Sequence, residues 1–126
     1  MPYLLKTEPG TYSFDDLVRE GETTWDGISN PQALANLRSM RKGDKLAIYH
    51  SGSGKVAVGT AEVVSLDASD AKDPKVRIKA GKRLARERTL GEMREAGVFA
   101  GSILLRQFRL SVVPLSEAQY EWLTKG

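Results

Sequence analysis

An aromatic side chain, a carboxylate and an amide stand close together in the sequence, at Trp25, Asp26 and Asn30. An aromatic plane beside hydrogen-bonding groups is suited to stacking on a flat ring and contacting its edge, as in pockets that bind a nucleobase. The alternative interpretation is structural. In that case Trp25 covers the core, while Asp26 and Asn30 accept hydrogen bonds from turn and helix N–H groups.

Basic residues could supply a second kind of chemistry, the binding of phosphate. The densest basic run consists of Lys79, Lys82, Arg83, Arg86 and Arg88. A second cluster consists of Arg38, Arg41, Lys42 and Lys45. Such clusters are either solvated faces or surfaces for the phosphates of a nucleic acid, and the net charge of +3 is compatible with both interpretations.

Catalytic and metal-binding groups are scarce. The chain has no cysteine and a single histidine, His50, which excludes disulfides, thiolate nucleophiles and His-rich metal sites. His50 could act as a general base, but no nucleophile or paired carboxylates accompany it. The segment 51–56 contains glycines and a lysine, yet it lacks the spacing of a phosphate-binding P-loop and predicts a hairpin turn. We therefore expect no enzyme activity, no metal and no cofactor.

The length of 126 residues predicts a single domain spanning 1–126. The first ten residues, MPYLLKTEPG, contain too short an apolar run for a signal peptide or a membrane span. We expect a monomeric cytoplasmic protein that does not contact membranes, and that is associated with the nucleoid if it is prokaryotic.

Hydrophobic patterns and capping signals predict the elements that hold these residues. A buried strand is expected at 3–7, and Ser13 with Asp16 then forms a capping box that begins a helix. The residues expected on the buried face of that helix are Phe14, Leu17 and Val18. Gly21 ends the helix, and Trp25 is expected in the turn that follows.

A second helix is expected to begin at Asn30, because asparagine is a strong N-cap and Pro31 suits the first helical position. Its expected buried residues are Ala33, Leu34 and Leu37. Strands at 45–50 and 55–64 are expected at the centre of the sheet, joined by a glycine-containing turn. A polar loop is expected at 65–74.

The rest of the chain predicts further strands and helices. Apolar and basic residues alternate at 76–80, as in a strand with one face in water. Capping boxes predict a helix after Thr89 and a closing helix after Ser116. The segment 102–107 fits a helix or a strand, and 110–113 predicts a strand. Since the strands come in a run with helices around it, we expect an α+β fold with a mixed, largely antiparallel sheet or small barrel.

Five motifs follow one another along the chain. They are YLLKTEPGTYSFDDL, WDGISNPQA, GDKLAIYHS, VGTAEVV and RQFRLSVVPL. Their types and order resemble the EVE domain, a member of the PUA-like superfamily, over nearly the whole chain. The resemblance implies a PUA-like fold, a small curved barrel with helices, and a pocket that accepts a base. Members of the family are thought to bind modified cytosines in DNA, such as 5-methylcytosine and 5-hydroxymethylcytosine, and the wider superfamily binds RNA.

The matching motif positions imply a pocket and a set of backbone contacts. The pocket candidates are Lys6, Thr7, Trp25, Asp26, Gly27, Ile28, Asn30, Tyr49, His50 and Ser51. The candidates for phosphate or backbone contacts are Arg106, Gln107 and Arg109, together with Lys79, Lys82, Arg83, Arg86 and Arg88. In this hypothesis a base stacks on Trp25, while Asp26, Asn30 and Ser51 contact its polar edge.

The chain departs from the family pattern beside the proposed pocket. Pro31 and Leu34 stand where the family commonly has a tyrosine and an arginine, and Thr7 stands where it commonly has a serine. We therefore predict a protein that binds nucleic acid and takes in one base, a modified cytosine of DNA, with an RNA-binding module as the alternative. An enzyme acting on nucleosides and a protein-interaction module are the remaining alternatives.

Overall fold

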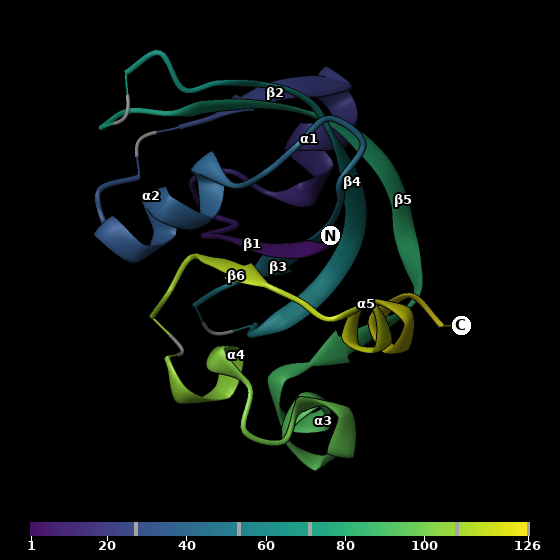
Figure 1. Cartoon of the computed structure of the whole chain (residues 1–126). Coiled ribbons are helices and arrows are strands. Elements are labelled where there is room, and N and C mark those ends of the chain that lie inside the picture. The colour runs from purple at the N-terminus through teal and green to yellow at the C-terminus, as the bar shows by residue number, and fades with distance from the viewer. Residues whose placement is uncertain (27, 53, 71, 108, 126) are drawn as a thin grey trace.

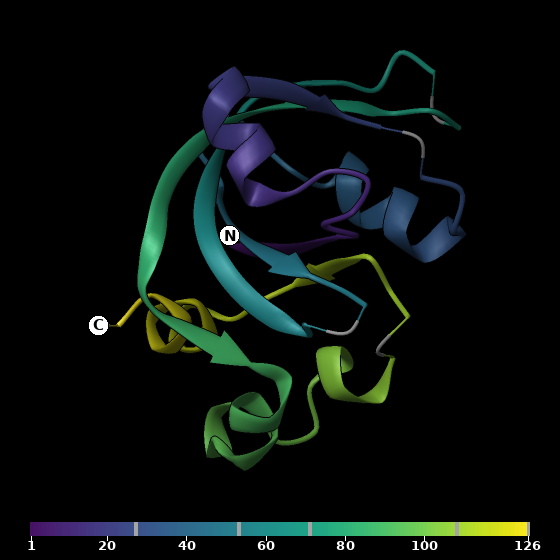
Figure 2. The same ribbon diagram turned by 180° about the vertical axis from the view of Figure 1, so that it is seen from behind.

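A curled six-stranded sheet forms the centre of the molecule in the computed structural model, which describes residues 1–26, 28–52, 54–70, 72–107 and 109–125 (Figures 1 and 2). The strands lie in the order β2 (Glu22–Trp25), β5 (Lys75–Thr89), β4 (Val56–Asp67), β3 (Lys45–His50), β1 (Tyr3–Thr7) and β6 (Val112–Pro114). Only the β1–β3 pair is parallel among these neighbours. The mixed, largely antiparallel sheet expected from the sequence is confirmed, with β3 and β4 at its centre.

Helices surround this sheet. Among the described residues they are α1 (Phe14–Glu20), α2 (Pro31–Arg38), α3 (Leu90–Glu95), α4 (Ile103–Arg106) and α5 (Glu117–Thr124), with a 3-10 turn at Gly97–Phe99. Each predicted N-cap is formed: the side chains of Ser13, Asn30, Thr89 and Ser116 all accept hydrogen bonds from backbone N–H groups of the first turn. The helices α3 and α4 lie at the opposite end of the molecule from α1 (Figure 1).

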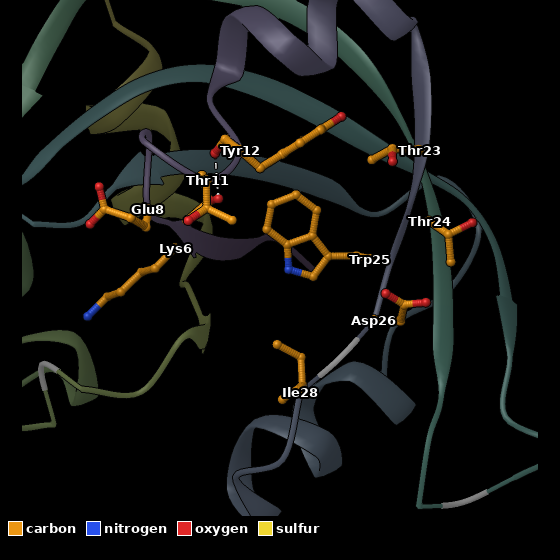
Figure 3. Close-up of a pocket in the computed structure, with 10 residues that line it drawn as sticks. Lys6, Glu8, Thr11, Tyr12, Thr23, Thr24, Trp25, Asp26 and Ile28 are labelled. Atoms are coloured by element: carbon orange, nitrogen blue, oxygen red, sulfur yellow. Dashed lines mark hydrogen bonds between the residues drawn. The ribbon is translucent and has the colours of Figure 1, made fainter.

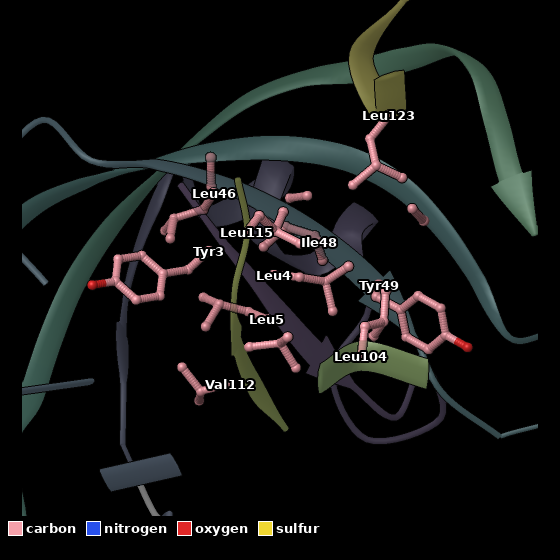
Figure 4. Close-up of a cluster of buried hydrophobic side chains, with 14 of the residues drawn as sticks. Tyr3, Leu4, Leu5, Leu46, Ile48, Tyr49, Leu104, Val112, Leu115 and Leu123 are labelled. Atoms are coloured by element: carbon pink, nitrogen blue, oxygen red, sulfur yellow. The ribbon is translucent and has the colours of Figure 1, made fainter. Parts of the chain in front are cut away.

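The core holds β1 firmly in the sheet. Tyr3, Leu4 and Leu5 are all buried, although successive side chains of a strand point to opposite faces. They are buried because β1 lies between β3 and β6 and has side chains packed on both faces (Figure 4). This packing fixes the end of β1, where Lys6 and Thr7 emerge from the core.

Three local predictions from the sequence are wrong. Trp25 does not lie in a turn but ends strand β2, which pairs antiparallel with β5 and places Trp25 opposite Val76. Strand β4 continues to Asp67, because its polar end still pairs with β5. Val18 is 50% exposed and does not join the buried face of α1.

Other predictions were open or inexact. The segment 102–107 contains a helix, α4, and the last strand runs over Val112–Pro114. Leu34 is half-buried, whereas Ala33 and Leu37 form the fully buried face of α2. Strand β5 extends through the whole basic run to Thr89, so the side chains of this run alternate between the two faces of the sheet.

The close packing of α1 on the sheet depends on Gly59. The pairing register of β4 shifts at Gly59 on its β5 side, and the buried ring of Phe14 covers the α-carbon. A Cβ at this position would lie 2.3 Å from Cζ of Phe14 and within 2.6 Å of two more ring atoms. No side chain fits there unless the ring moves.

We expect Gly59→Ala to lower the free energy of unfolding by about 1–3 kcal/mol, because the new methyl group overpacks the contact with Phe14. Urea denaturation measures this loss. Gly91→Ala is the matched control, since its Cβ would come no closer than 3.8 Å to the nearest atom and alanine favours the helix α3. Equal stability of Gly59→Ala and the wild type would contradict this account of the packing.

Candidate functional site

A cavity of about 560 Å³ opens between the end of β1, the loop that leads to α1, and strand β2. Its lining residues are Lys6, Thr7, Glu8, Thr11, Tyr12, Thr23, Thr24, Trp25, Asp26 and Ile28 (Figure 3). In the sheet, β1 and β2 are separated by three other strands. They share one cavity because the sheet is curled, so that its two sides face each other.

Trp25 forms the apolar wall of the cavity and is also part of the core. It is only 9% exposed and packs edge-to-face against Tyr12, with the ring centroids 6.1 Å apart and the planes at 76°. The indole nitrogen lies on the ring edge that faces Ile28 and Lys6, away from Tyr12 (Figure 3). A base that stacks on the whole face of Trp25 would therefore have to displace a neighbouring side chain.

The loop between β1 and α1 is held by hydrogen bonds. The Thr7 hydroxyl donates to the carbonyl of Tyr12 at 2.6 Å, and the Tyr12 N–H donates to the carbonyl of Glu8 at 2.8 Å. The Tyr12 hydroxyl in turn donates to the Glu20 carboxylate. Burial, together with this hydrogen bond, raises the pKa of Tyr12. The loop thus presents a neutral phenol and the Glu8 carboxylate to the cavity.

Lys6 supplies a cation that is partly withdrawn from water. Its Nζ lies 5.5 Å from the centroid of the Tyr49 ring, and burial lowers its pKa to about 8. Glu8 and Asp26 are exposed carboxylates at the cavity. The cavity therefore combines an aromatic wall, two carboxylates that accept hydrogen bonds, and one amine that donates them.

Only part of the predicted pocket set lines this cavity. The five residues that do so are Lys6, Thr7, Trp25, Asp26 and Ile28. Gly27 lies outside the described residues. The other four, Asn30, Tyr49, His50 and Ser51, lie beside it and have structural contacts.

Each of these four contacts has a clear physical reason. Asn30 Oδ1 accepts hydrogen bonds from the first turn of α2 at 2.9 and 3.0 Å, which is its role as an N-cap. Tyr49 is buried beneath Lys6. The N–H of Ser51 donates to the carbonyl of Thr7 at 2.9 Å, and His50 Nε2 accepts from the N–H of Phe14 at 3.0 Å. These four residues hold neighbouring elements in place and do not line the cavity.

The basic run on β5 is largely engaged in ion pairs. Lys79 pairs with Glu62 at 3.3 Å, Arg83 with Asp15, and Arg86 with Glu92 at 3.3 Å. Lys82 is exposed. Only the first part of β5 pairs with β2, so the later residues of the run lie along the strand toward α3.

Arg88 is a correction to the predicted phosphate contacts. It is buried, its guanidinium lies 4.6 Å from the centroid of the Trp122 ring, and its Nη2 donates to the carbonyl of Lys125 at 3.0 Å. These contacts join β5 to α5. Because Arg88 does not reach the surface, it is withdrawn from the set of phosphate-binding residues.

Sequence reasoning missed several residues of the cavity and its rim. The missed lining residues are Glu8, Thr11, Tyr12, Thr23 and Thr24. Arg77 lies at the rim, where its Nη1 donates to Thr24 Oγ1 at 3.3 Å and its Nε pairs with Glu22 at 3.3 Å. The alternation at 76–80 signalled an exposed face for Arg77, but only the pairing of β5 with β2 brings that face to the cavity.

The segment between α4 and β6 adjoins the opposite side of the cavity. The N–H of Lys6 donates to the carbonyl of Ser111 at 2.9 Å, which ties this segment to the end of β1. Arg106 at the end of α4 is exposed, as are Gln107 and Arg109 in this segment. Exposed arginines therefore occur on β5 and near the segment that is hydrogen-bonded to the end of β1.

The chain matches the family model of the EVE domain over residues 2–126. It therefore belongs to the EVE domain family, and its curled mixed sheet with surrounding helices is the PUA-like fold of that family. This confirms the fold that the sequence motifs implied.

Several solved structures resemble the chain. Rpa0253 from Rhodopseudomonas palustris is 34% identical, with a TM-score of 0.89 and coverage of 98% of this chain and 90% of that one. Atu2648 from Agrobacterium tumefaciens is 30% identical, with a TM-score of 0.91 and coverage of 98% and 90%. The human THYN1 protein, solved in complex with DNA containing 5-methylcytosine, is 22% identical, with a TM-score of 0.86 and coverage of 98% and 95%. Comparison with curated protein sequences gave no match.

The described part of the chain contains no group of three or more His, Asp or Glu side chains arranged to hold a metal ion. None of the helices formed by these residues is long and apolar enough to cross a membrane.

The contact between His50 and Phe14 predicts a pH dependence. A protonated imidazole has no acceptor to offer the N–H of Phe14, and burial lowers the pKa of His50 below its ordinary value of 6.5. A lowered pKa in the folded state means that the contribution to stability is present above about pH 6.5 and is lost as the pH falls through the folded-state pKa.

We expect the free energy of unfolding of the wild type to fall more steeply below about pH 6.5 than that of His50→Gln, whose amide oxygen can accept from Phe14 at every pH. Urea denaturation across this range measures both slopes. Parallel curves for the two proteins would contradict the role assigned to His50.

Proposed function

We propose that this protein binds DNA and takes a modified cytosine into the cavity beside Trp25. The observation that carries the proposal is the combination, in one cavity, of an aromatic wall, two carboxylates and an amine, in a chain of the EVE family. The human THYN1 protein, which has the same fold and was solved with DNA containing 5-methylcytosine, supports DNA as the partner.

The groups in the cavity complement the edge of cytosine. Its exocyclic amino group is a donor that Glu8 or Asp26 can accept, and its ring nitrogen and carbonyl are acceptors for Lys6. The apolar surfaces of Trp25 and Ile28 suit a methyl group on the ring. A base enters such a cavity only after it leaves the stack, at a cost of a few kcal/mol. Stacking gives back about 1–3 kcal/mol, so the edge contacts determine which base is preferred.

The phosphates would be held by exposed cations around the cavity. Arg106 and Arg109 adjoin the side of Lys6, and Arg77 adjoins the side of Thr24. Lys82 lies farther along β5 and extends the same surface. Because these groups contact the backbone and not the base, their contribution to affinity falls as salt concentration rises and is the same for every sequence.

The direct test is a binding titration with DNA duplexes that differ at one central base, which is cytosine, 5-methylcytosine or 5-hydroxymethylcytosine. We expect one modified duplex to bind about tenfold more tightly than the unmodified one at two salt concentrations, and to quench tryptophan fluorescence. Equal binding of all three duplexes would contradict the proposal. Tighter binding of a matched RNA would favour the RNA-binding alternative, since an RNA-binding site recognises the 2′-hydroxyl.

Variants of the cavity separate base recognition from phosphate binding. Asp26→Asn should reduce the preference for the modified base several-fold, because an amide oxygen is a weaker acceptor than a carboxylate. Trp25→Phe should reduce it as well, and phenylalanine is chosen over alanine because Trp25 is largely buried. Both variants should still bind unmodified DNA, and this binding should still weaken as the salt concentration rises.

The readout for these variants is the ratio of the two affinities. Removing an acidic charge raises the affinity for every duplex, so affinity alone does not report base recognition. Glu121→Gln, on the exposed face of α5, is a control for the loss of a carboxylate and should leave the ratio unchanged. An unchanged ratio in both Asp26→Asn and Trp25→Phe would place base recognition outside this cavity.

A further inference from the structure

Lys6 differs from the other lysines of the chain in its burial and in its position at the cavity. Its backbone is fixed on two sides, by pairing with Tyr49 of β3 and by the hydrogen bond of its N–H to the carbonyl of Ser111. Its side chain is half-buried and lines the cavity, whereas every other lysine of the chain is exposed. A single amine is therefore held at the place where a nucleic-acid strand would insert a base.

The surroundings of this amine favour its neutral form. The Nζ lies against the Tyr49 ring, and burial lowers its pKa to about 8. At pH 7 about a tenth of such amines are neutral, against roughly 0.04% for an ordinary lysine. The neutral amine is the nucleophile, and a lysine desolvated in an apolar pocket is the type that forms Schiff bases with carbonyl compounds.

We propose that the Lys6 amine captures an aldehyde carried by a nucleic-acid strand whose base position is inserted into the cavity beside Trp25. This inference rests on the proposed function, since the strand must deliver the aldehyde to the cavity. The capture is a reversible covalent form of binding and requires no turnover.

The reaction is balanced without an oxidant or a reductant. The Nζ lone pair attacks the aldehyde carbon, a C–N bond forms, and the carbonyl oxygen takes up a proton to give a carbinolamine. Loss of the hydroxyl as water then leaves an imine between Nζ and the former aldehyde carbon. Glu8 lines the same cavity and carries a carboxylate that can accept the proton from the amine and return it to the departing oxygen.

Two lesions or modifications present this chemistry. A formyl group on the cytosine ring places the aldehyde on the base, and the ring-opened sugar of an abasic site places it on the backbone. Both are aldehydes on an otherwise intact strand. The two sources differ in whether a base fills the space beside Trp25 and Ile28 when the amine reacts.

The experiment incubates the full-length protein with four duplexes, which contain cytosine, 5-methylcytosine, 5-formylcytosine or an abasic site, in the presence of cyanoborohydride to reduce the imine to a stable amine. Denaturing gels measure the adduct, and peptide mass spectrometry locates it. We expect an adduct with at least one aldehyde duplex, located at Lys6, and none with the other two. Adducts spread over the exposed lysines would overturn the proposal.

Two variants complete the test. Lys6→Arg keeps the positive charge but forms no imine under these conditions, and we expect it to lose at least 90% of the adduct. Lys42→Arg, at an exposed position in the turn before β3, is the matched control and should react like the wild type. An undiminished adduct in Lys6→Arg would overturn the proposal, and the peptide map of the wild type tests it independently should Lys6→Arg be unstable.

The outcome is distinguishable from that of the base-binding test. If the protein prefers 5-methylcytosine but forms no adduct with either aldehyde, the capture by Lys6 is wrong and the proposed function stands. If Lys6 forms an adduct with the abasic duplex while all intact duplexes bind alike, capture stands and the base recognition is wrong.

Discussion

The curl of strands β4 and β5 is the constraint on which the rest of the structure depends. Their backbone makes two close contacts where no side chain fits, at Gly59 beneath the Phe14 ring and at Gly81 beside Thr60, where a Cβ would lie 2.4 Å from the threonine hydroxyl. A flat sheet would leave β1 and β2 far apart, because three strands separate them. The curl brings both to one cavity, and so places Lys6 and Trp25 together.

Several residues belong to the core and also line or support the cavity. Trp25 belongs to the core and yet forms the wall of the cavity, so its position is fixed before any ligand arrives. Tyr49 is buried and yet provides the ring against which Lys6 lies. His50 supports the start of α1 through Phe14, and the loop before α1 carries Glu8 and other lining residues. The side chains that line the cavity are thus positioned by core contacts, and such preorganisation would lower the cost of binding a ligand there.

Structural features that depend on interactions within a few residues could be predicted from the sequence. Caps such as Ser13 and Asn30 were predicted because the hydrogen bonds they make lie within one turn of the chain. Strand β2 was missed because its four residues become a strand only through pairing with β5, more than fifty residues away. Motif positions identified Lys6 and Trp25 at the cavity, but the burial of Arg88 against Trp122 depends on long-range packing that no motif encodes.

Entry of a modified cytosine into the cavity beside Trp25 can be observed by NMR of a duplex that carries a carbon-13-labelled 5-methyl group. A methyl group beside the indole would show an upfield shift from the ring current and through-space contacts to protons of Trp25 and Ile28. We expect both on binding. A methyl signal that keeps its free-duplex position while the duplex is fully bound would contradict it, because the base would then remain stacked in the DNA.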